Sequence, residues 1–313
     1  MAALPSLRQL SYLVALADTL HFTEAAKRCF VTQSTLSGGI IELERVLGGV
    51  LVERTRQHVR LTPLGEKVVA RAKLMLADAH DLQRLSRELG EPLTGDLHLG
   101  VIPTIAPFIL SALLQAVRQD MPKLNLHLHE LQSQTAVEQL TDGRLDMVLL
   151  ALPFATDGLY VESLYPEPLY WVTHQDDPLY TQIQHMDDLP LERMLLLEEG
   201  HCLRDHALSA CPLGDQAGIS GLEASSLPTL MQMVHAQLGY TFLPEMAVHS
   251  GFVRAHAGLV AKPLIDAPVR TLALLARKSS TQMAEFERLS ALVRSLLRNT
   301  NAAPQPNAAS DKN

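Results

Sequence analysis

Residues 22–47 read FTEAAKRCFVTQSTLSGGIIELERVL, and this stretch decides the fold of the amino-terminal region. Its apolar spacing predicts a short helix over Thr23–Arg28 and, after a very short turn, a longer helix that ends at Gly48. Two helices joined in this way indicate a helix-turn-helix. Thr32 would cap the second helix, and short polar side chains in its first turns would then face DNA base edges and phosphates. The predicted contacts of this helix are Thr32, Gln33, Ser34, Thr35 and Ser37.

Two glycines, Gly38 and Gly39, interrupt the second helix at a cost of about 1 kcal/mol each relative to alanine. They are either close-packing positions or places where the backbone approaches DNA. Beyond the helix, Val50–Glu53 and Val59–Thr62 predict two short strands around a basic turn, and we interpret this hairpin as a wing that contacts phosphates or the minor groove. A solvated basic turn is the alternative. The predicted contacts of the wing are Arg54 and Arg56.

A first helix begins after Ser6, so residues 5–62 form a predicted all-α winged helix-turn-helix domain. Pro63 opens a long helix, residues 63–90, with a single apolar stripe along about seven turns. Such a stripe needs a partner, and a second copy of the same helix is the simplest one. A linker and dimerisation helix is therefore expected, followed by a hinge at Glu91–Gly95.

The rest of the chain alternates between strands and helices, which predicts an α/β effector domain over residues 91–298 with mostly parallel sheets. The predicted strands are Leu97–Ile102, Leu124–Leu131, Asp146–Leu150, Leu169–Thr173, Met194–Leu197, Thr241–Leu243 and Thr271–Ala276. At this length the domain is expected to have two lobes, lobe I at about 91–163 and 268–298 and lobe II at about 164–267. Residues 299–313 are rich in Asn, Ala and Pro and predict a disordered tail.

Composition narrows the classes of protein. Hydrophobic residues make up 47% and charged residues 19%, which argues against wholesale disorder. No apolar run reaches the length of a membrane span and no signal sequence is evident, so a cytoplasmic bacterial protein is expected. The net charge is -8, yet residues 1–65 carry +2 and the remainder -10. This asymmetry suggests a small basic reader attached to a larger acidic domain.

A second informative stretch, residues 198–212, reads EEGHCLRDHALSACP. Gly200 and Pro212 mark a plausible start and stop of a helix that would hold Cys202 in its first turn and Cys211 near its end. The helix dipole and the neighbouring His201 are expected to lower the pKa of the Cys202 thiol. A thiolate attacks peroxide to give a sulfenic acid, which a second thiol can condense with.

The spacing of the two cysteines adds a condition. Nine residues of helix give a rise of about 13.5 Å, whereas disulfide-bonded Cα atoms lie roughly 4.4–6.8 Å apart. A bond between them would therefore require the helix to unfold. Two alternatives stay open at this point: both cysteines are small buried hydrophobes, or they bind zinc together with His201 and His206.

Other candidates are weaker. Cys29 lies among apolar neighbours and is interpreted as structural, while His127 and His129 alternate on one strand face and are expected to contact solvent or another subunit rather than a metal. Thr104 follows a strand at the start of a helix, where it would either meet a ligand or cap the helix. The sequence contains no glycine-rich phosphate loop, nucleophile elbow or metalloprotease motif.

The whole pattern resembles the LysR-type transcriptional regulators. The resemblance is carried by Phe22–Ala26, Val31–Ser37, Ile41–Glu44, Leu51–Arg54 and Leu61–Gly65, and it extends over nearly the whole chain except the tail. It implies a winged helix-turn-helix and linker helix joined to a two-lobed domain like periplasmic binding proteins, usually in a homotetramer built as a dimer of dimers.

Within that family, the segment from Gly200 to Cys211 resembles the peroxide-sensing branch. This resemblance implies that Cys202 is the peroxidatic thiol and Cys211 the resolving one. It also implies that Thr104, His201 and Arg204 line the peroxide pocket. His206 departs from the pattern of the branch, where a glutamine is expected, and so does Pro212 directly after Cys211.

We therefore expect a regulator, mainly an activator of oxidative-stress genes, that binds promoter DNA and senses hydrogen peroxide through a reversible disulfide. Its expected partners are RNA polymerase and a glutaredoxin- or thioredoxin-type reductant, with no cofactor, no metal and no membrane. The main alternative is a LysR-type regulator that answers a metabolite bound between the lobes. A thiol peroxidase is a third interpretation, but turnover needs no DNA-reading domain, so we expect no enzyme.

Overall fold

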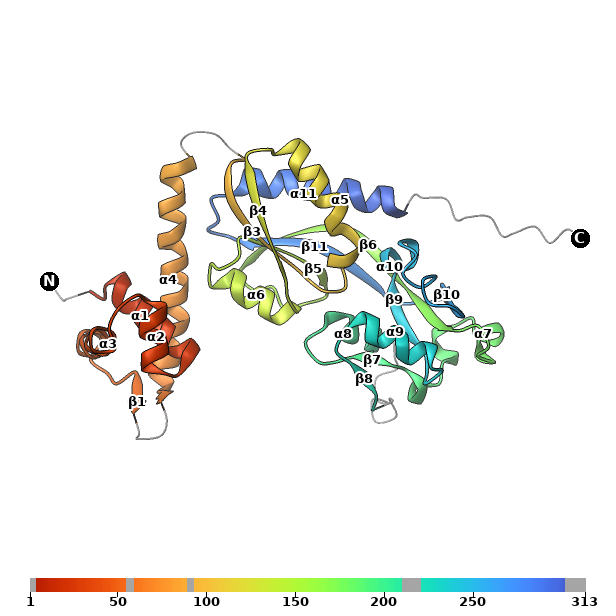
Figure 1. Cartoon of the computed structure of the whole chain (residues 1–313), viewed down its shortest axis with the longest axis horizontal. Helices are drawn as coiled ribbons and strands as arrows, with labels where there is room; N and C mark the ends of the chain where they lie inside the picture. The colour runs from red at the N-terminus through yellow and green to blue at the C-terminus, as the bar shows by residue number, and fades with distance from the viewer. Residues whose placement is uncertain (1–3, 55–58, 89–92, 210–220, 302–313) are drawn as a thin grey trace, which may run out of the picture. The chain divides into compact units, whose positions relative to one another are not determined.

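The computed structural model describes residues 4–54, 59–88, 93–209 and 221–301 (Figure 1). The chain divides into two compact units, whose residues come mostly from before and after Gly90. Within the described ranges, every helix is too short or too polar to cross a membrane.

The amino-terminal unit is a helical bundle with a small hairpin. Its helices are α1 (Leu7–Thr19), α2 (Phe22–Arg28), α3 (Gln33–Leu47) and α4 (Pro63–Glu88), and its strands are β1 (Val52–Arg54) and β2 (Val59–Leu61). The two strands pair antiparallel, with Val52 opposite Leu61. Ser6 caps α1 in a capping box with Gln9, as predicted. The helix-turn-helix and the hairpin that follows it are confirmed.

Helix α3 shows why this unit forms where the sequence predicts it. The Thr32 side chain accepts a hydrogen bond from the Thr35 backbone, which confirms it as the N-cap. The apolar face of the helix, made by Leu36, Ile40 and Leu43, is fully buried. Gly48 ends the helix with φ +70°, a left-handed conformation that favours glycine.

The two glycines inside α3 have different surroundings. A Cβ on Gly39 would lie 2.6 Å from Cδ2 of Tyr12, so this position is required for close packing of α1 against α3. A Cβ on Gly38 would meet nothing within 4 Å. The close-packing interpretation therefore holds for Gly39, and an approach to DNA stays a prediction for Gly38.

The second unit is built on one large mixed sheet. The strand order is β10-β6-β11-β5-β3-β4, with β9 also paired to β6. These strands are β3 (Gly95–Val101), β4 (Leu124–Glu130), β5 (Met147–Leu152), β6 (Leu159–His174), β9 (Thr241–Pro244), β10 (Leu259–Lys262) and β11 (Val269–Arg277). Among the described strands of this sheet, only the β3–β4 and β3–β5 pairs are parallel, so the expectation of mostly parallel sheets is wrong. The cause is the long strand β6 and the late strand β11, which pair antiparallel with their neighbours.

Helices cover this sheet and a smaller one. The helices are α5 (Ala106–Asp120), α6 (Ser133–Thr141), α7 (Leu179–Gln182), α8 (Cys202–Leu208), α9 (Leu227–His235), α10 (Glu245–His249) and α11 (Met283–Asn301), with 3-10 turns at Met186–Asp188 and Leu191–Arg193. The smaller sheet pairs β7 (Leu196–Leu197) with β8 (Glu223–Ala224) in parallel. Helices α5 and α11 lie side by side (Figure 1). A separate apolar core around Trp171, Leu203 and Phe242 fills lobe II.

Two predicted boundaries change. Helix α8 ends at Leu208 with Ser209 as its C-cap, so it stops before Cys211 and the predicted nine-residue helix between the two thiols is wrong. Cys211 and Pro212 lie outside the described residues. Helix α11 continues to Asn301, three residues into the predicted tail, so the tail does not begin at 299. Residues 302–313 lie outside the described ranges.

Candidate functional site

The first candidate site is the exposed start of α3. Thr32, Gln33, Ser34 and Thr35 are exposed, and Ser37 is half-buried. The Thr32 hydroxyl lies 2.9 Å from that of Ser34 and 2.8 Å from that of Thr35, so these side chains form one polar cluster at the helix start. Gln33 accepts a hydrogen bond of 3.3 Å from the Thr23 hydroxyl. The structure thus brings together the side chains predicted to read base edges.

The wing is tied to α3 by one carboxylate. Glu44 accepts hydrogen bonds from the backbone N–H groups of Leu51 (2.8 Å) and Val52 (3.1 Å). Because Glu44 lies in α3, the strand β1 is held at a fixed place beside the reading helix. Arg54 ends β1, whereas Arg56 lies outside the described residues. The DNA contacts of both arginines stay predictions.

The weaker candidates have ordinary roles in the structure. Cys29 follows α2 as its C-cap, half-buried, and burial raises the pKa of its thiol. His129 pairs with His98, with Nδ1 of His98 and Nε2 of His129 3.1 Å apart, while the half-exposed His127 contacts Asp96. In the part of the chain that the structure describes, no group of three or more ligating side chains could hold a metal ion.

The second candidate site surrounds Cys202, the first residue of α8. Cys202 is only 3% exposed, and its thiol is free. Ser133, at the start of α6, the backbone of Ala151, in β5, and the guanidinium of Arg270, in β11, are all close enough to act on the charge of the sulfur. Elements α6, β5, β11 and α8 therefore converge on one sulfur atom.

The expectation of a lowered pKa for Cys202 is wrong. Burial raises the pKa of the thiol, and the charge of Arg270 with the polar groups of Ser133 and Ala151 opposes this effect without reversing it. Helix α8 has only seven residues and no side-chain cap, so its dipole lowers the pKa of the thiol only weakly. The protonated thiol is consequently the resting state at neutral pH.

His201, the N-cap residue of α8, does not supply a positive charge either. It is 6% exposed, and burial lowers the pKa of its imidazole. Its Nε2 lies 3.1 Å from Nε2 of Gln132, a group that only donates, so the imidazole accepts there. A contact with the backbone of Ser225 engages the ring further. His201 is a neutral, fully engaged side chain next to the thiol.

Thr104 and Arg270 form a buried network that the sequence did not reveal. Arg270 is completely buried and donates to the Thr104 hydroxyl (2.8 Å) and to the Thr104 carbonyl (3.2 Å). Glu167, also completely buried, accepts from Nε of Arg270 at 2.8 Å. Glu167 in turn accepts from the backbone of Met246. Thr104 does not cap α5, because Ile105 is the N-cap residue of that helix.

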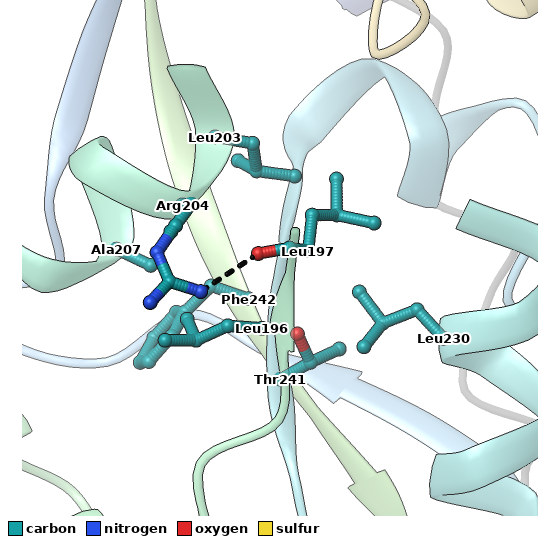
Figure 2. A pocket seen from close by; sticks show the side chains of 8 residues that line it. All are labelled: Leu196, Leu197, Leu203, Arg204, Ala207, Leu230, Thr241 and Phe242. Carbon is teal, nitrogen blue, oxygen red and sulfur yellow. Dashed lines mark hydrogen bonds between the residues drawn. The ribbon is translucent and has the colours of Figure 1, made fainter. Parts of the chain in front are cut away.

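Arg204 points to the other side of α8. Its Nη1 donates to the Leu197 carbonyl at 3.1 Å (Figure 2). The same nitrogen donates to Glu223 at 2.5 Å. It lines a small apolar cavity of about 10 Å³, which has room for about one water molecule. The lining residues are Leu196, Leu197, Leu203, Arg204, Ala207, Leu230, Thr241 and Phe242. The structure therefore does not bring Arg204 together with the groups around Cys202.

Arg270 and Glu167 were missed, although the sequence held a signal for both. Each is the one charged residue in a run of otherwise uncharged residues, 165–173 for Glu167 and 269–276 for Arg270, where an unpaired buried charge would be costly. Ser133 and Gln132 carry no such signal, because a polar residue at a helix start usually serves as a cap. Their role is visible only once α6 and α8 are seen together.

Comparisons with known proteins agree with this architecture. Residues 7–66 match the family described as bacterial regulatory helix-turn-helix protein, lysR family, and residues 90–298 match the LysR substrate binding domain. The chain belongs to the LysR family of bacterial transcriptional regulators.

The chain is similar to relatives with two different names, EstR and OxyR. The chain is 63% identical over 287 residues to the HTH-type transcriptional regulator EstR of Acinetobacter baylyi, covering 92% of this chain and 95% of that one. It is 38% identical over 291 residues to the dual regulator OxyR of Escherichia coli, covering 92% and 95%. A full-length OxyR variant from Pseudomonas aeruginosa superposes with a TM-score of 0.75 at 34% identity, covering 97% and 100%. A hydrogen-peroxide-bound OxyR mutant from Corynebacterium glutamicum gives a TM-score of 0.62 at 32% identity, covering 96% and 95%.

Proposed function

We propose that this regulator senses hydrogen peroxide through Cys202 and Cys211. The observation that carries the proposal is the environment of Cys202, a buried thiol that lies close to Ser133, the backbone of Ala151 and the guanidinium of Arg270. Such groups stabilise the negative charge that develops on sulfur and on a departing oxygen. The similarity to OxyR proteins supports the same assignment.

The proposed chemistry has two balanced steps. The sulfur of Cys202 attacks one peroxide oxygen, the O–O bond breaks, and the thiol proton leaves with the other oxygen as water, so that a sulfenic acid remains. The thiol of Cys211 then attacks this sulfur and releases a second water, forming the disulfide. Two electrons pass from the two thiols to one peroxide. A glutaredoxin- or thioredoxin-type dithiol would reverse the oxidation.

The proposed oxidation would act on the complex of the regulator with promoter DNA. We propose that two pairs of reading helices, in a dimer of dimers, bind duplex DNA and that oxidation changes their spacing and the contact with RNA polymerase. Reversing the charge at both Arg54 and Arg56 should weaken binding to all sequences and reduce the salt dependence, whereas Gln33→Ala should change which sequence is preferred. Unchanged affinity and salt dependence in the charge-reversed chain would remove the wing from this proposal.

The central test is thiol chemistry in the full chain. One equivalent of hydrogen peroxide should remove two free thiols and shift the footprint on a promoter, whereas Cys202→Ser should abolish both effects. Cys211→Ser should accumulate a sulfenic acid at Cys202, detected by mass spectrometry after trapping. A wild-type chain that keeps all three thiols and its footprint would overturn the proposal.

A second candidate function is a regulator that answers a small metabolite, with inert cysteines. What favours it is that the chain is more similar to EstR, at 63% identity, than to OxyR of Escherichia coli, at 38%. The two candidates differ in one measurement: a metabolite response survives in the Cys202→Ser/Cys211→Ser double variant, whereas a peroxide response does not.

A further inference from the structure

Three histidines of the large sheet form a cluster that the chemistry above does not use. His98 lies in β3, and His127 and His129 lie in β4, the last strand in the described order. The two strands pair in parallel, with His98 opposite His127. Residues two apart along a strand share one face of a sheet, so His129 lies on the same face as His127. The strand pairing therefore brings three imidazole rings together.

The rings pack against one another. The centroids of His98 and His127 lie 4.6 Å apart, and those of His98 and His129 lie 5.4 Å apart. Nδ1 of His98 lies 3.1 Å from Nε2 of His129, so one of these nitrogens donates a hydrogen bond and the other accepts it. Two ring nitrogens from different strands thus meet at one place.

The same distance suits two ligands of one cation. A zinc–imidazole bond is about 2.0–2.1 Å long, so two nitrogens bound to one zinc ion lie about 2.9 Å apart at a right angle and about 3.3 Å apart at a tetrahedral angle. The 3.1 Å between Nδ1 of His98 and Nε2 of His129 lies between these values. A cation that replaces the shared hydrogen therefore needs only a small rotation of the rings.

The strands hold this pair of histidines in place. The backbone N–H of His98 donates to Oδ2 of the fully buried Asp146 at 2.7 Å. Strand β3 also pairs with β5, on the side opposite to β4. Because the backbone of His98 is fixed from two sides, its ring starts from a preorganised position, which lowers the cost of binding a ligand.

A carboxylate adds negative charge to the cluster. Oδ1 of Asp96 accepts hydrogen bonds from Nε2 of His127 and from Nδ2 of Asn125, each at 3.2 Å. These two hydrogen bonds lower the pKa of Asp96, so the carboxylate is ionised at neutral pH. The side chains of His127 and Asp96 are 49% and 56% exposed. The cluster is therefore open to solvent, beside a charge that attracts cations.

The ligand atoms select the kind of cation. Imidazole nitrogen suits Zn²⁺, Cu²⁺ and Ni²⁺, whereas Mg²⁺ and Ca²⁺ prefer oxygen ligands. Two imidazoles fill fewer positions than the four side chains of a structural zinc site, so water would complete the coordination. This count agrees with the described residues, which offer no group of three side chains for such an ion.

We propose that Nδ1 of His98 and Nε2 of His129 together bind one divalent transition-metal cation, with water in the remaining positions. The bound cation joins β3 to β4. The sequence led us to compare His127 with His129 and to expect no metal, whereas the structure pairs His129 with His98. The inference does not depend on the proposed function, since none of these histidines takes part in the thiol chemistry.

Titration calorimetry of the full chain with Zn²⁺ tests this site. The thiols are removed first, in a Cys29→Ser/Cys202→Ser/Cys211→Ser chain, because thiolates also bind zinc. In that background, His98→Gln and His129→Gln should each weaken the tightest binding more than about tenfold, since even the outer-shell partners of metal ligands are worth about 10–100-fold.

The matched control is His127→Gln. This variant loses a ring contact but no ligand, and its affinity for Zn²⁺ should stay within about threefold of the parent chain. Circular dichroism checks that each chain is folded. Equal affinity in all four chains would overturn the proposal, because the zinc would then bind elsewhere. An equal loss in the three single-site variants would also overturn it, since the effect would then belong to the packing of the cluster.

Two further measurements need no substitution of the ligands. Millimolar Mg²⁺ should leave the Zn²⁺ titration unchanged, and competition by Mg²⁺ would contradict an imidazole site. One equivalent of Cu²⁺ in the same thiol-free chain should give an electron paramagnetic resonance spectrum with coupling to two imidazole nitrogens, which 15N-labelling of histidine changes. Coupling to one nitrogen only, or to none, would contradict the pair as ligands.

Discussion

The helices α3 and α8 are held in their units by different means. Helix α3 has 15 residues, a side-chain N-cap and a buried face made only of aliphatic residues. Helix α8 has seven residues, no side-chain cap, and a buried face that contains Cys202 and His206 beside Leu203 and Ala207. Apolar burial does not depend on any ligand, whereas buried polar groups are stable only while their partners are present. Helix α3 is therefore stable without any ligand, whereas the stability of α8 depends on the partners of its buried polar groups.

The largest expected effect comes from the polar network that faces α8. Arg270→Met leaves the carboxylate of Glu167 buried without its partner, and it should lower the free energy of unfolding of the effector domain by about 3–5 kcal/mol. Chemical denaturation followed by tryptophan fluorescence measures this, because Trp171 lies in that domain.

A matched double variant tests the cause. Arg270→Met with Glu167→Gln removes both charges and should recover most of the lost stability. If the double variant is as unstable as the single one, the ion pair is not what holds the network together.

Helix α3 should lose stability when a buried aliphatic side chain is shortened, even though no polar contact is removed. Ile40→Ala creates a cavity at a fully buried position and should cost about 2–5 kcal/mol, with loss of DNA binding at growth temperature. Hydrogen exchange measures the opening of α3. Ile41→Ala is the control, since Ile41 is 54% exposed, and exchange in this variant as fast as in Ile40→Ala would contradict the apolar account.

The two helices should also differ in how their stability depends on pH. The pKa of His206 is about 4 in the fold, against an ordinary imidazole pKa of 6.5 in the unfolded chain, so between these pH values the unfolded chain binds one proton more than the folded one. The free energy of unfolding should fall by about 3 kcal/mol as pH is lowered from about 6.5 to about 4, and His201 acts in the same direction. Equilibrium denaturation at several pH values measures the slope.

The control for that slope is His206→Gln, which should flatten it. The buried face of α3 holds no titratable group, so local exchange in α3 should not follow pH in this window beyond the intrinsic exchange rate. An equal slope in wild type and His206→Gln would assign the effect to other groups.

The cap of α3 is a smaller contribution. Thr32→Ala removes the side-chain acceptor for the Thr35 N–H and should cost about 1 kcal/mol. Thr32→Ser keeps the acceptor and should be close to wild type in thermal unfolding. If the two variants unfold alike, the cap does not stabilise this helix.

The smallest effect is expected at Arg204. Arg204→Met removes a partly exposed pair with Glu223 and should cost below about 1 kcal/mol. Because the guanidinium lies away from Cys202, the rate of oxidation by hydrogen peroxide should stay within about twofold of wild type, measured by stopped flow. A tenfold lower rate of oxidation would mean that Arg204 acts in the proposed peroxide site.

The two helices also differ in how far the sequence predicts them. Helix α3 could be predicted because its spacing, cap and terminal glycine are local signals. The network around Cys202 could not, since Arg270 and Thr104 are 166 residues apart and meet only through the order of strands in the sheet. The pKa of Cys202 was predicted in the wrong direction for the same reason: burial is a property of the assembled domain, whereas the helix dipole and His201 are visible nearby in the chain.

The buried pair of Arg270 and Glu167 has one more consequence, for how a ligand arrives. The two charges are 2.8 Å apart and cancel at a distance, so this pair exerts little attraction on a molecule still in solution. A small uncharged oxidant would then enter by unassisted diffusion, at a rate that hardly depends on ionic strength. Binding of the amino-terminal unit to DNA, by contrast, should depend steeply on ionic strength. Added salt would therefore weaken DNA binding while leaving the rate of thiol oxidation by the uncharged oxidant almost unchanged.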